Sequence, residues 1–468
     1  MALQLPALLT KSLQAVTSFD ATAFEQVHQS GEQIVSVRSN PSKCIDTATR
    51  LQHFTELMPT DIATTAITPV PWSSHGYYLP HRPFFTFDPL LHAGAYYVQE
   101  ASSMFLEQAL RQTTNLNQPL KVLDLCAAPG GKSTLLQSLL SSESVLVSNE
   151  VIKQRAAILE ENISKWGAAN VVVTNNDPAH FARLENYFDV LVVDAPCSGS
   201  GLFRKDPTAI EEWSENNVAL CSQRQQRILI DAWPALKEGG LLIYSTCSYS
   251  AEENEEISDW LMQQLQVSTC RLQLQPAWGI EEVQSASGAN GYRFWPYKVK
   301  GEGFFLAAFR KQSGGDYYAT TNGKNAERLT KAQEQMVAAW LQPAAGVQLL
   351  KQKEAILLLP DNLADALPTL QQALYIKKAG ITMGKLVHNE LVPHHDFAMS
   401  CYVNDAIVRV ALNKEEALQY LRRNDVVNTY HHKGWALVQY AQQSLGWVKL
   451  LQNRVNNYYP KEWRILKQ

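Results

Sequence analysis

Two cysteines stand in short polar segments that follow apolar runs, and these positions make them the first candidates for chemistry. Cys197 lies in DAPC, after the run FDVLVV at 188–193, and Cys247 lies in STCS, after LLIY at 241–244. The ends of buried strands are partly exposed, so a thiolate there can serve as a nucleophile. If the two strands are neighbours, both thiols face the same crevice. Small buried hydrophobes are the usual role of free cysteines, and it suits Cys44, Cys221, Cys270 and Cys401.

A second candidate site is the run KVLDLCAAPGGKS at 121–133, which reads as a strand, a turn of small residues and the start of a helix. Small residues let a ligand approach the backbone closely, and a helix N-terminus favours nucleotide-type ligands. A phosphate-binding P-loop would need glycine at position 126 and would use an N–H that proline lacks. We therefore predict a nucleoside site whose ligand has no pyrophosphate, formed by Cys126, Ala127, Ala128, Pro129, Gly130, Gly131 and Lys132.

Three acids end the strands that follow this turn. Glu150 lies about 20 residues beyond Gly131, the spacing at which a carboxylate binds ribose hydroxyls. Asp177 is placed to accept a hydrogen bond from an adenine amino group, and Asp194 lies beside the expected reacting centre. A single acid at a strand end is most often a turn former, but three acids together with the Gly-rich turn favour a cofactor site.

The elements that must position these residues alternate between strand and helix patterns, which predicts a parallel, doubly wound α/β sheet. Acids at 252–256 open one of the helices and are interpreted as a solvated first turn that suits the helix dipole. A further strand is predicted over 304–309. The predicted core strands cover 121–125, 144–150, 170–177, 188–194 and 241–248, and the helices cover 133–140, 152–167, 218–236 and 252–265.

The regions on either side of this core carry weaker signals. The N-terminal region, residues 1–110, contains a strand-like run at 31–40 and an aromatic, proline-rich run at 69–87 that suits either a packed loop or a base-contacting surface. Residues 313–324 read as a linker. In the C-terminal region, 325–468, a helical stretch is followed by two strand-like runs, and a basic, aromatic tail suits either RNA or a surface over a small core. The tail carries Lys449, Arg454, Tyr458, Tyr459, Lys461, Trp463, Arg464 and Lys467.

Composition bounds the alternatives. A chain of 468 residues is long enough for two to four domains. No apolar stretch is long enough to span a membrane, and the first residues do not resemble a secretory signal. Seven scattered cysteines indicate reduced thiols, so we expect a cytoplasmic protein. A net charge of −4 means that any RNA-binding surface must be local. No metal is expected, because His394-His395 and His431-His432 lack ligand spacing and are interpreted as surface residues. Nothing requires an oligomer.

The motifs CAAPGGKS, DAPCSGSG and STCS, in this order, resemble the signature of RNA cytosine-5 methyltransferases, the Nop2/Sun/Fmu group. The resemblance covers roughly residues 90–310, and the chain length and C-terminal region are most similar to members that act on small-subunit (16S) ribosomal RNA. It implies a Rossmann-like class I S-adenosylmethionine-dependent methyltransferase core at 111–312. It also implies an N-terminal RNA-binding extension at 1–110 and a PUA-like RNA-binding region at 325–468. Ser200 departs from the pattern, since related sequences often carry an acid there.

The resemblance implies roles for the two thiols that the residues alone leave unordered. Carbon-5 of cytosine is a poor nucleophile, and addition of a thiolate at carbon-6 makes it enamine-like. In the group, Cys247 would attack, Cys197 would assist release, and Asp194 would stabilise charge on the ring at N3. The role of Lys132 stays open, at the methionine carboxylate or at the active site. The target base must leave its stack to reach both thiols.

The resemblance also implies S-adenosyl-L-methionine as cofactor and ribosomal RNA, within the 30S subunit, as partner. Three alternatives remain: the same chemistry on tRNA or 23S rRNA, a DNA cytosine methyltransferase, and a non-catalytic RNA-binding ribosome-assembly factor. The thiol of Cys247 argues against the DNA enzyme, which attacks with the Pro-Cys thiol. The intact cysteines and acids argue against the non-catalytic factor.

Overall fold

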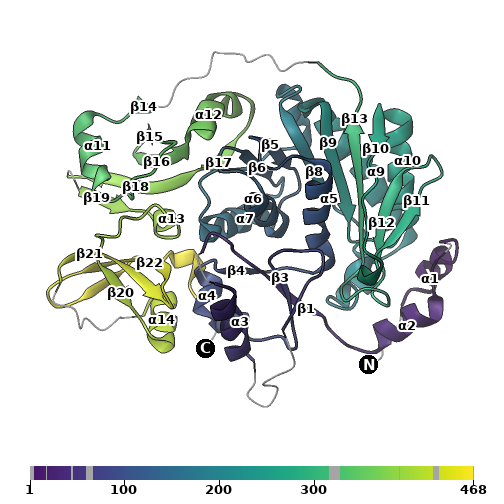
Figure 1. Cartoon of the computed structure of the whole chain (residues 1–468), viewed down its shortest axis with the longest axis horizontal. Coiled ribbons are helices and arrows are strands. Elements are labelled where there is room, and N and C mark those ends of the chain that lie inside the picture. Colours follow the sequence, from purple (N-terminus) through teal and green to yellow (C-terminus); the bar gives the residue numbers. More distant parts are fainter. Residues whose placement is uncertain are drawn as a thin grey trace.

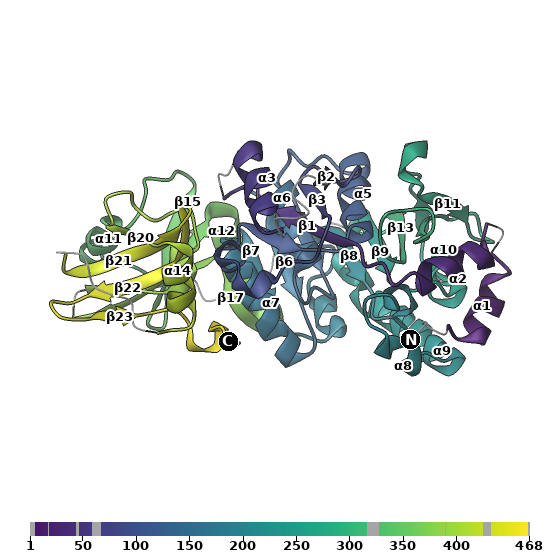
Figure 2. The same cartoon turned by 90° about the horizontal axis from the view of Figure 1, so that it is seen from below.

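A ten-stranded sheet with helices on both faces forms the centre of the molecule (Figure 1). The coordinates are a computed structural model that describes residues 5–16, 18–43, 46–58, 67–315, 327–388, 390–424 and 432–466. Smaller sheets lie at its edges, and the molecule is elongated, with helices α1 (Ala7–Leu13) and α2 (Ala21–Gln29) at one end and the C-terminal sheet at the other (Figure 2).

Five parallel strands make up the middle of the central sheet, in the order β9-β8-β5-β6-β7. The chain runs outward from β5 to β7, then returns to place β8 on the other side of β5. Ligands of doubly wound sheets bind at such a reversal of strand order. The predicted parallel α/β sheet is therefore confirmed. Its strands are β5 (Lys121–Asp124), β6 (Val145–Asn149), β7 (Val171–Thr174), β8 (Phe188–Asp194) and β9 (Leu236–Thr246).

Antiparallel strands extend the sheet beyond β9, and the predicted strand over 304–309 is confirmed among them. β9 itself begins earlier than predicted: it runs through Gly239-Gly240, where the pairing with β8 shifts register between Phe188 and Val190. A glycine pair that reads as a turn in the sequence is thus an irregularity within a strand. The added strands are β10 (Val267–Thr269), β11 (Glu281–Gln284), β12 (Asn290–Phe294) and β13 (Phe304–Lys311).

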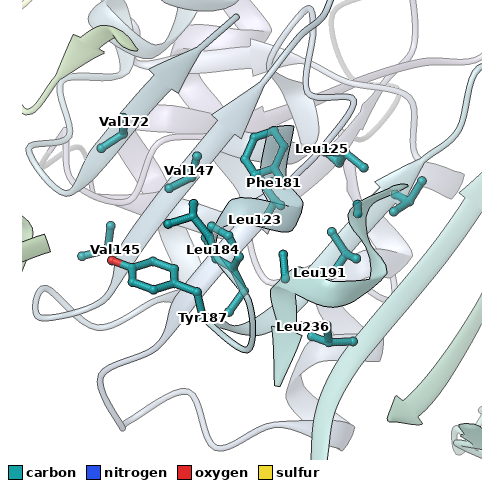
Figure 3. Packing of buried hydrophobic residues seen from close by; sticks show 14 of the residues in the cluster. Leu123, Leu125, Val145, Val147, Val172, Phe181, Leu184, Tyr187, Leu191 and Leu236 are labelled. Carbon is teal, nitrogen blue, oxygen red and sulfur yellow. The ribbon is translucent and has the colours of Figure 1, made fainter. Parts of the chain in front are cut away.

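Alternate side chains of the parallel strands enter two separate cores, as the two-residue period of a strand requires. Leu123, Val147 and Leu191 pack on one face with residues of α9, α10 and α12, a cluster shown in part in Figure 3. Val122, Leu146 and Val192 pack on the other face with α5, α6 and α7. These helices are α5 (Leu106–Thr113), α6 (Gly131–Leu139), α7 (Lys153–Trp166), α9 (Glu215–Ala232), α10 (Glu255–Gln264) and α12 (Asp361–Ala373), while the short α8 (Thr208–Glu212) lies outside both cores.

The N-terminal region forms a four-stranded antiparallel sheet in the order β2-β3-β1-β4. Within the aromatic run at 69–87, Trp72, Tyr78 and Phe85 are buried, so these rings pack into the protein, whereas Phe84 is 85% exposed. The region comprises β1 (Val35–Ser39), α3 (Thr47–Glu56), β2 (Thr68–Pro69), β3 (Gly76–Leu79), α4 (Pro89–His92) and β4 (Tyr96–Val98), with short 3-10 turns at Phe85–Phe87 and Ser102–Phe105.

The C-terminal region contains two sheets rather than one. The first, in the order β14-β15-β16-β18-β19, lies beside the core, and β17 leaves this region to pair antiparallel with β7 of the central sheet. The predicted linker is described only at 313–315, and its residues 316–324 lie outside the described part of the chain. The elements are β14 (Glu327–Arg328), α11 (Lys331–Ala338), β15 (Val347–Gln352), β16 (Ala355–Pro360), β17 (Ile376–Ala379), β18 (Ile381–Val387), β19 (Glu390–Pro393) and α13 (His395–Ala398).

The second C-terminal sheet shares a hydrophobic core with the N-terminal sheet, because Val438, Leu445 and Tyr459 belong to the same buried cluster as Val37 and Tyr96. Both predicted strand-like runs are strands here. The domain boundaries at 110, 312 and 325 stay predictions. The elements are β20 (Arg409–Ala411), α14 (Lys414–Leu421), β21 (Gly434–Tyr440), β22 (Gln443–Leu450), β23 (Val455–Asn457) and a 3-10 turn at Lys461–Trp463.

Candidate active site

The two candidate cysteines meet at the carboxyl edge of the central sheet. β8 and β9 pair in parallel, so the segments that follow them lie side by side. The Cys197 and Cys247 sulfurs are 3.0 Å apart, and both thiols are free and half-buried. Backbone hydrogen bonds join the two segments: Ala195 N–H donates to Ser245 O and Gly201 N–H donates to Cys247 O, both at 2.8 Å. The prediction that both thiols share one crevice is confirmed.

Asp194 and Lys132 form an ion pair beside the thiols. Lys132 Nζ lies 2.7 Å from Asp194 Oδ2, and the Ser245 hydroxyl donates to Asp194 Oδ1 at 2.8 Å. Burial lowers the pKa of Lys132, but the adjacent Asp194 carboxylate more than offsets this, so the pKa is raised overall. The lysine is therefore a permanent cation, and the structure places it at the thiols and Asp194. Whether Lys132 also meets the methionine carboxylate stays open.

The surroundings of Cys197 disfavour its thiolate form. Its hydrogen bond with Cys247, followed by burial, raises the pKa of Cys197 well above the usual thiol value. A lysine ammonium near a sulfur stabilises thiolate charge, and Lys132 interacts electrostatically with Cys247. The order in which the two thiols act stays a prediction.

The Gly-rich turn leads from β5 into α6 as predicted. Gly130 has φ +117°, a conformation that favours glycine, and Gly131 is the first residue of the helix. The Ala128–Pro129 peptide bond is cis. Side chains of α7 hold the turn from outside: Arg155 donates to Ala128 O and Asn162 donates to Pro129 O, both at 2.8 Å.

The predicted acids occupy different surroundings. Glu150 follows β6, is 3% exposed, and accepts a hydrogen bond from Ile152 N–H at 2.9 Å. Asp177 lies three residues beyond the end of β7, and its Oδ2 is 3.1 Å from Arg227 of α9. Glu150 and Asp194 both act on the Cys126 thiol. Burial is the largest cause of the raised pKa of this thiol, and the two carboxylates raise the pKa further.

Asp124 is a site residue that the motif reading passed over, because it lies inside an apolar run. It is fully buried at the end of β5, accepts a hydrogen bond from the Ser133 hydroxyl at 2.6 Å, and its Oδ1 has no partner. Burial raises the pKa of Asp124 from 3.8 to about 7, opposed by the Ser133 hydrogen bond. Asp124, Glu150 and Asp194 interact electrostatically, and three grouped acids suit a ligand with positively charged groups and disfavour a polyphosphate. S-adenosylmethionine, with its sulfonium and ammonium groups, fits this site.

The interpretation of the acids at 252–256 as a solvated helix start is wrong for Glu253. This residue is 0% exposed, in a 3-10 turn (Ala251–Glu253) before α10. Its carboxylate accepts hydrogen bonds from the two serines that follow the cysteines, Ser198 and Ser248. The sequence EENEE at 252–256 does not indicate which of its acids faces the interior. Glu255 also pairs with buried Arg293, at 2.5 Å.

Arg38 links the N-terminal sheet to the cofactor turn. It lies on β1, is 2% exposed, and donates to Gly131 O at 3.2 Å and to Thr134 Oγ1 at 2.6 Å. Its guanidinium also lies 4.7 Å from the centre of the Trp166 ring. The first turn of α6 is therefore held by a residue almost 100 positions earlier in the chain.

Histidines were predicted to lie at the surface, and this is wrong for one of them. His395 is 5% exposed, packed edge-on against Tyr459 and Trp463, whereas His394 and His432 are exposed. His431 lies outside the described residues. Within the described ranges, no group of three or more His, Cys, Asp and Glu side chains is arranged to hold a metal ion. Among the same residues, no helix has the length and apolar character needed to cross a membrane.

Comparison with known proteins assigns the chain. Family models match three successive parts: the N-terminal domain of 16S rRNA methyltransferase RsmF (residues 5–101), 16S rRNA methyltransferase RsmB/F (112–310) and the methyltransferase RsmF PUA domain (408–465). The ribosomal RNA small subunit methyltransferase F of Enterobacter sp. strain 638 is 30% identical over 85% of this chain and 84% of its own length. The chain belongs to the ribosomal RNA small subunit methyltransferase F family. The Citrobacter koseri member is also 30% identical, covering 85% of each chain.

Solved structures agree with this family assignment. A methyltransferase homologue from Pyrococcus horikoshii is 26% identical with a TM-score of 0.50, and the match covers 66% of this chain and all of that one. The Pyrococcus horikoshii NSun6 protein bound to SFG, an analogue of S-adenosylmethionine, is 18% identical with a TM-score of 0.53. It covers 66% of this chain and 98% of its own, which shows the shared fold. The chain is an S-adenosylmethionine-dependent methyltransferase with a C-terminal PUA-like domain.

Proposed function

We propose that this protein transfers a methyl group from S-adenosylmethionine to carbon-5 of a cytosine in 16S ribosomal RNA. The observation that carries the proposal is the contact between the Cys197 and Cys247 sulfurs, 3.0 Å apart, beside Asp194. Methylation of a nitrogen or oxygen needs no covalent nucleophile, whereas carbon-5 must first be activated by addition at carbon-6. A pair of thiols at one base supplies one group for the addition and a second group to assist the elimination.

In the proposed reaction Cys247 forms a bond to carbon-6 and Cys197 acts in release. The assignment is supported by the surroundings of the two thiols: the thiolate of Cys197 is disfavoured, and the Lys132 cation interacts with Cys247. After methylation, the carbon-5 proton leaves with the help of Cys197, and the electron pair of that C–H bond expels the Cys247 thiolate. To act as the base in this step, Cys197 first gives its own proton to solvent; it then takes the carbon-5 proton and ends as a thiol, while Cys247 returns to the thiolate.

Asp194 is proposed to share a proton with N3 of the cytosine and so stabilise the negative charge that develops on the ring during addition. Its oxygens are already oriented by Lys132 at 2.7 Å and by the Ser245 hydroxyl at 2.8 Å. A carboxyl group held in place on both sides needs little reorganisation when the base enters. Lys132 thus serves the catalytic carboxylate.

S-adenosylmethionine supplies the electrophilic methyl group. The Gly-rich turn, residues 126–132, would form the floor of its site, with Glu150 placed for ribose hydroxyls. Asp177 remains a proposed adenine contact. To bind the adenine, the Asp177 carboxylate must give up its ion pair with Arg227, whose side chain is largely exposed. Asp124 lies buried beneath the turn and holds it through the hydrogen bond from Ser133.

RNA contact is proposed for the N-terminal region, 1–110, and the C-terminal region, 325–468, with the 30S subunit as the natural context. The basic and aromatic tail supports this for the second of them: Tyr458 is 39% exposed and Arg454 is exposed, whereas Tyr459 is buried. Exposed aromatic and basic side chains suit unpaired bases and phosphates. The target cytosine must be single-stranded or flipped out.

The test is transfer of labelled methyl from S-adenosylmethionine, offered in parallel to 30S subunits, free 16S rRNA, 23S rRNA and tRNA, followed by nucleoside analysis. We expect 5-methylcytidine in 16S rRNA. Label in tRNA or 23S rRNA would retain the chemistry and overturn the substrate. Absence of label in every RNA, with S-adenosylmethionine still bound, would favour a non-catalytic assembly factor.

Cysteine variants test the mechanism in the same assay. Cys247→Ala should abolish transfer and leave RNA binding unchanged, whereas Cys197→Ala should leave protein covalently attached to RNA after denaturation in SDS. Cys270→Ala is the matched control, because Cys270 is likewise a half-buried free thiol and lies outside the site. Activity retained in Cys247→Ala would remove Cys247 from the mechanism.

A further inference from the structure

Glu253 joins the two cysteine-bearing segments at equivalent positions. Ser198 and Ser248 each follow one of the cysteines, and their hydroxyls donate to the same carboxylate oxygen, Oε2, at 2.5 and 2.6 Å. The other oxygen, Oε1, accepts from Ser198 N–H at 2.8 Å and from Gln225 Nε2 at 3.1 Å. One buried side chain thus accepts four hydrogen bonds, and none of its donors carries a positive charge.

A buried carboxylate without a cation is costly unless its oxygens are fully hydrogen-bonded. Burial raises the pKa of Glu253, and the hydrogen bonds of Ser198 and Ser248 oppose this. A neutral glutamine of the same size would avoid the cost, but its amide nitrogen is a donor and could not accept from two hydroxyls. The acceptor-only geometry therefore requires a glutamate at this position.

The two segments depend on Glu253 to different extents. Ser248 has other anchors, since its N–H donates to Thr246 Oγ1 at 3.2 Å and its carbonyl accepts from Asn254 Nδ2 at 2.8 Å. The hydrogen bond from Gly201 N–H to Cys247 O, at 2.8 Å, anchors both segments, and Gln225 also donates to Pro196 O at 3.0 Å. For Ser198, next to Cys197, both the N–H and the hydroxyl are directed to Glu253. Loss of the carboxylate thus frees Ser198 more than Ser248.

We propose that Glu253 is a positioning residue that holds Cys197 against Cys247, so that both thiols act on one base. The proposal rests on the cytosine carbon-5 chemistry proposed above. It assigns Glu253 a specific share of that chemistry: attack by Cys247 needs only its own segment, whereas release needs Cys197 in place. Without Glu253, Cys247 still adds to the base, but the covalent adduct is not resolved by elimination.

The first experiment measures the thiols directly and needs no RNA. Diamide oxidises two neighbouring thiols to a disulfide, taking up two hydrogens to become a hydrazine, and mass spectrometry of peptides follows the Cys197–Cys247 link. Glu253→Gln should slow its formation by about tenfold relative to wild type, since hydrogen bonds to a charged group are lost. Glu256→Gln is the matched control, because Glu256 is exposed and lies one turn further along the same segment.

The second experiment measures release, with S-adenosylmethionine binding as the check on folding. With 16S rRNA or 30S subunits, Glu253→Gln should accumulate SDS-stable RNA adduct about tenfold over wild type and form 5-methylcytidine more slowly, while Glu253→Asp restores part of the release. A residue that serves stability alone would lower the melting temperature and leave the ratio of adduct to product unchanged. Disulfide formation and release both at the wild-type rate would overturn the proposal.

Two provisions keep the outcome decisive. If Glu253→Gln does not fold, the Ser198→Ala/Ser248→Ala double variant removes both hydroxyl donors instead. We expect it to form the disulfide more slowly and to accumulate adduct, and wild-type rates of both would overturn the proposal. If wild type and Cys197→Ala both give neither 5-methylcytidine nor adduct, the proposed function fails. The disulfide measurement then still decides whether Glu253 holds the thiols together.

Discussion

Asp124 makes the stability of the protein depend on pH in a direction opposite to that of most carboxylates. Its pKa rises from 3.8 to about 7 through burial, so the folded state favours the protonated acid. Between these two values the unfolded chain binds fewer protons than the folded one, and stability is therefore lost as pH rises. At about 1.4 kcal/mol for each pH unit, the full penalty is about 4 kcal/mol above pH 7, of which about 2.5 kcal/mol develops between pH 5 and pH 8.

Asp124→Asn removes the titration and keeps an oxygen that accepts from Ser133. We expect the free energy of unfolding of the variant, relative to wild type, to increase by about 2.5 kcal/mol between pH 5 and pH 8. Urea unfolding followed by tryptophan fluorescence at several pH values measures this difference. Asp405→Asn is the control for loss of a carboxylate, because the Asp405 side chain is 82% exposed. A difference between Asp124→Asn and wild type that does not change with pH would refute the reasoning.

Two further predictions concern contacts between regions. Arg38→Met should lower the melting temperature and should weaken S-adenosylmethionine binding, measured by calorimetry, by about 1–3 kcal/mol, because the hydrogen bonds to Gly131 O and Thr134 are lost. Arg82→Met is the control, because Arg82 is exposed. Unchanged affinity in Arg38→Met would contradict the link between the N-terminal sheet and the cofactor turn. A chain that ends before residue 325 should lose RNA affinity and the steep salt dependence of binding. Its core should also melt at a lower temperature, since β17 no longer covers β7; a core with unchanged melting would contradict this second part.

Much of the core could be predicted from the sequence because its signals are local. The run from Lys121 to Leu125 is apolar and ends in small residues, so the strand, turn and helix follow from short-range pattern alone. Gly167 likewise closes α7 with φ +82°, as its position after Trp166 predicts. The partnership of Cys197 and Cys247 also follows, once the strands before them are taken as neighbours.

What the sequence could not give depends on contacts between distant segments. Glu253 belongs to a run of acids that reads as solvated, and only the position of Ser198 explains why it turns inward. Arg38 and the pairing of β17 with β7 join regions that the pattern assigns to separate domains. His395 is buried because Tyr459 and Trp463 return from the C-terminus to cover it.

The most direct test of the central claim is to identify the residue that bonds to the RNA. Cys197→Ala is incubated with S-adenosylmethionine and 16S rRNA or 30S subunits, the adduct is digested with nuclease and protease, and the modified peptide is sequenced by mass spectrometry. The account predicts a 5-methylcytidine nucleotide attached to the sulfur of Cys247. A nucleotide attached elsewhere, or no attachment in a preparation whose wild-type enzyme forms 5-methylcytidine, would contradict it.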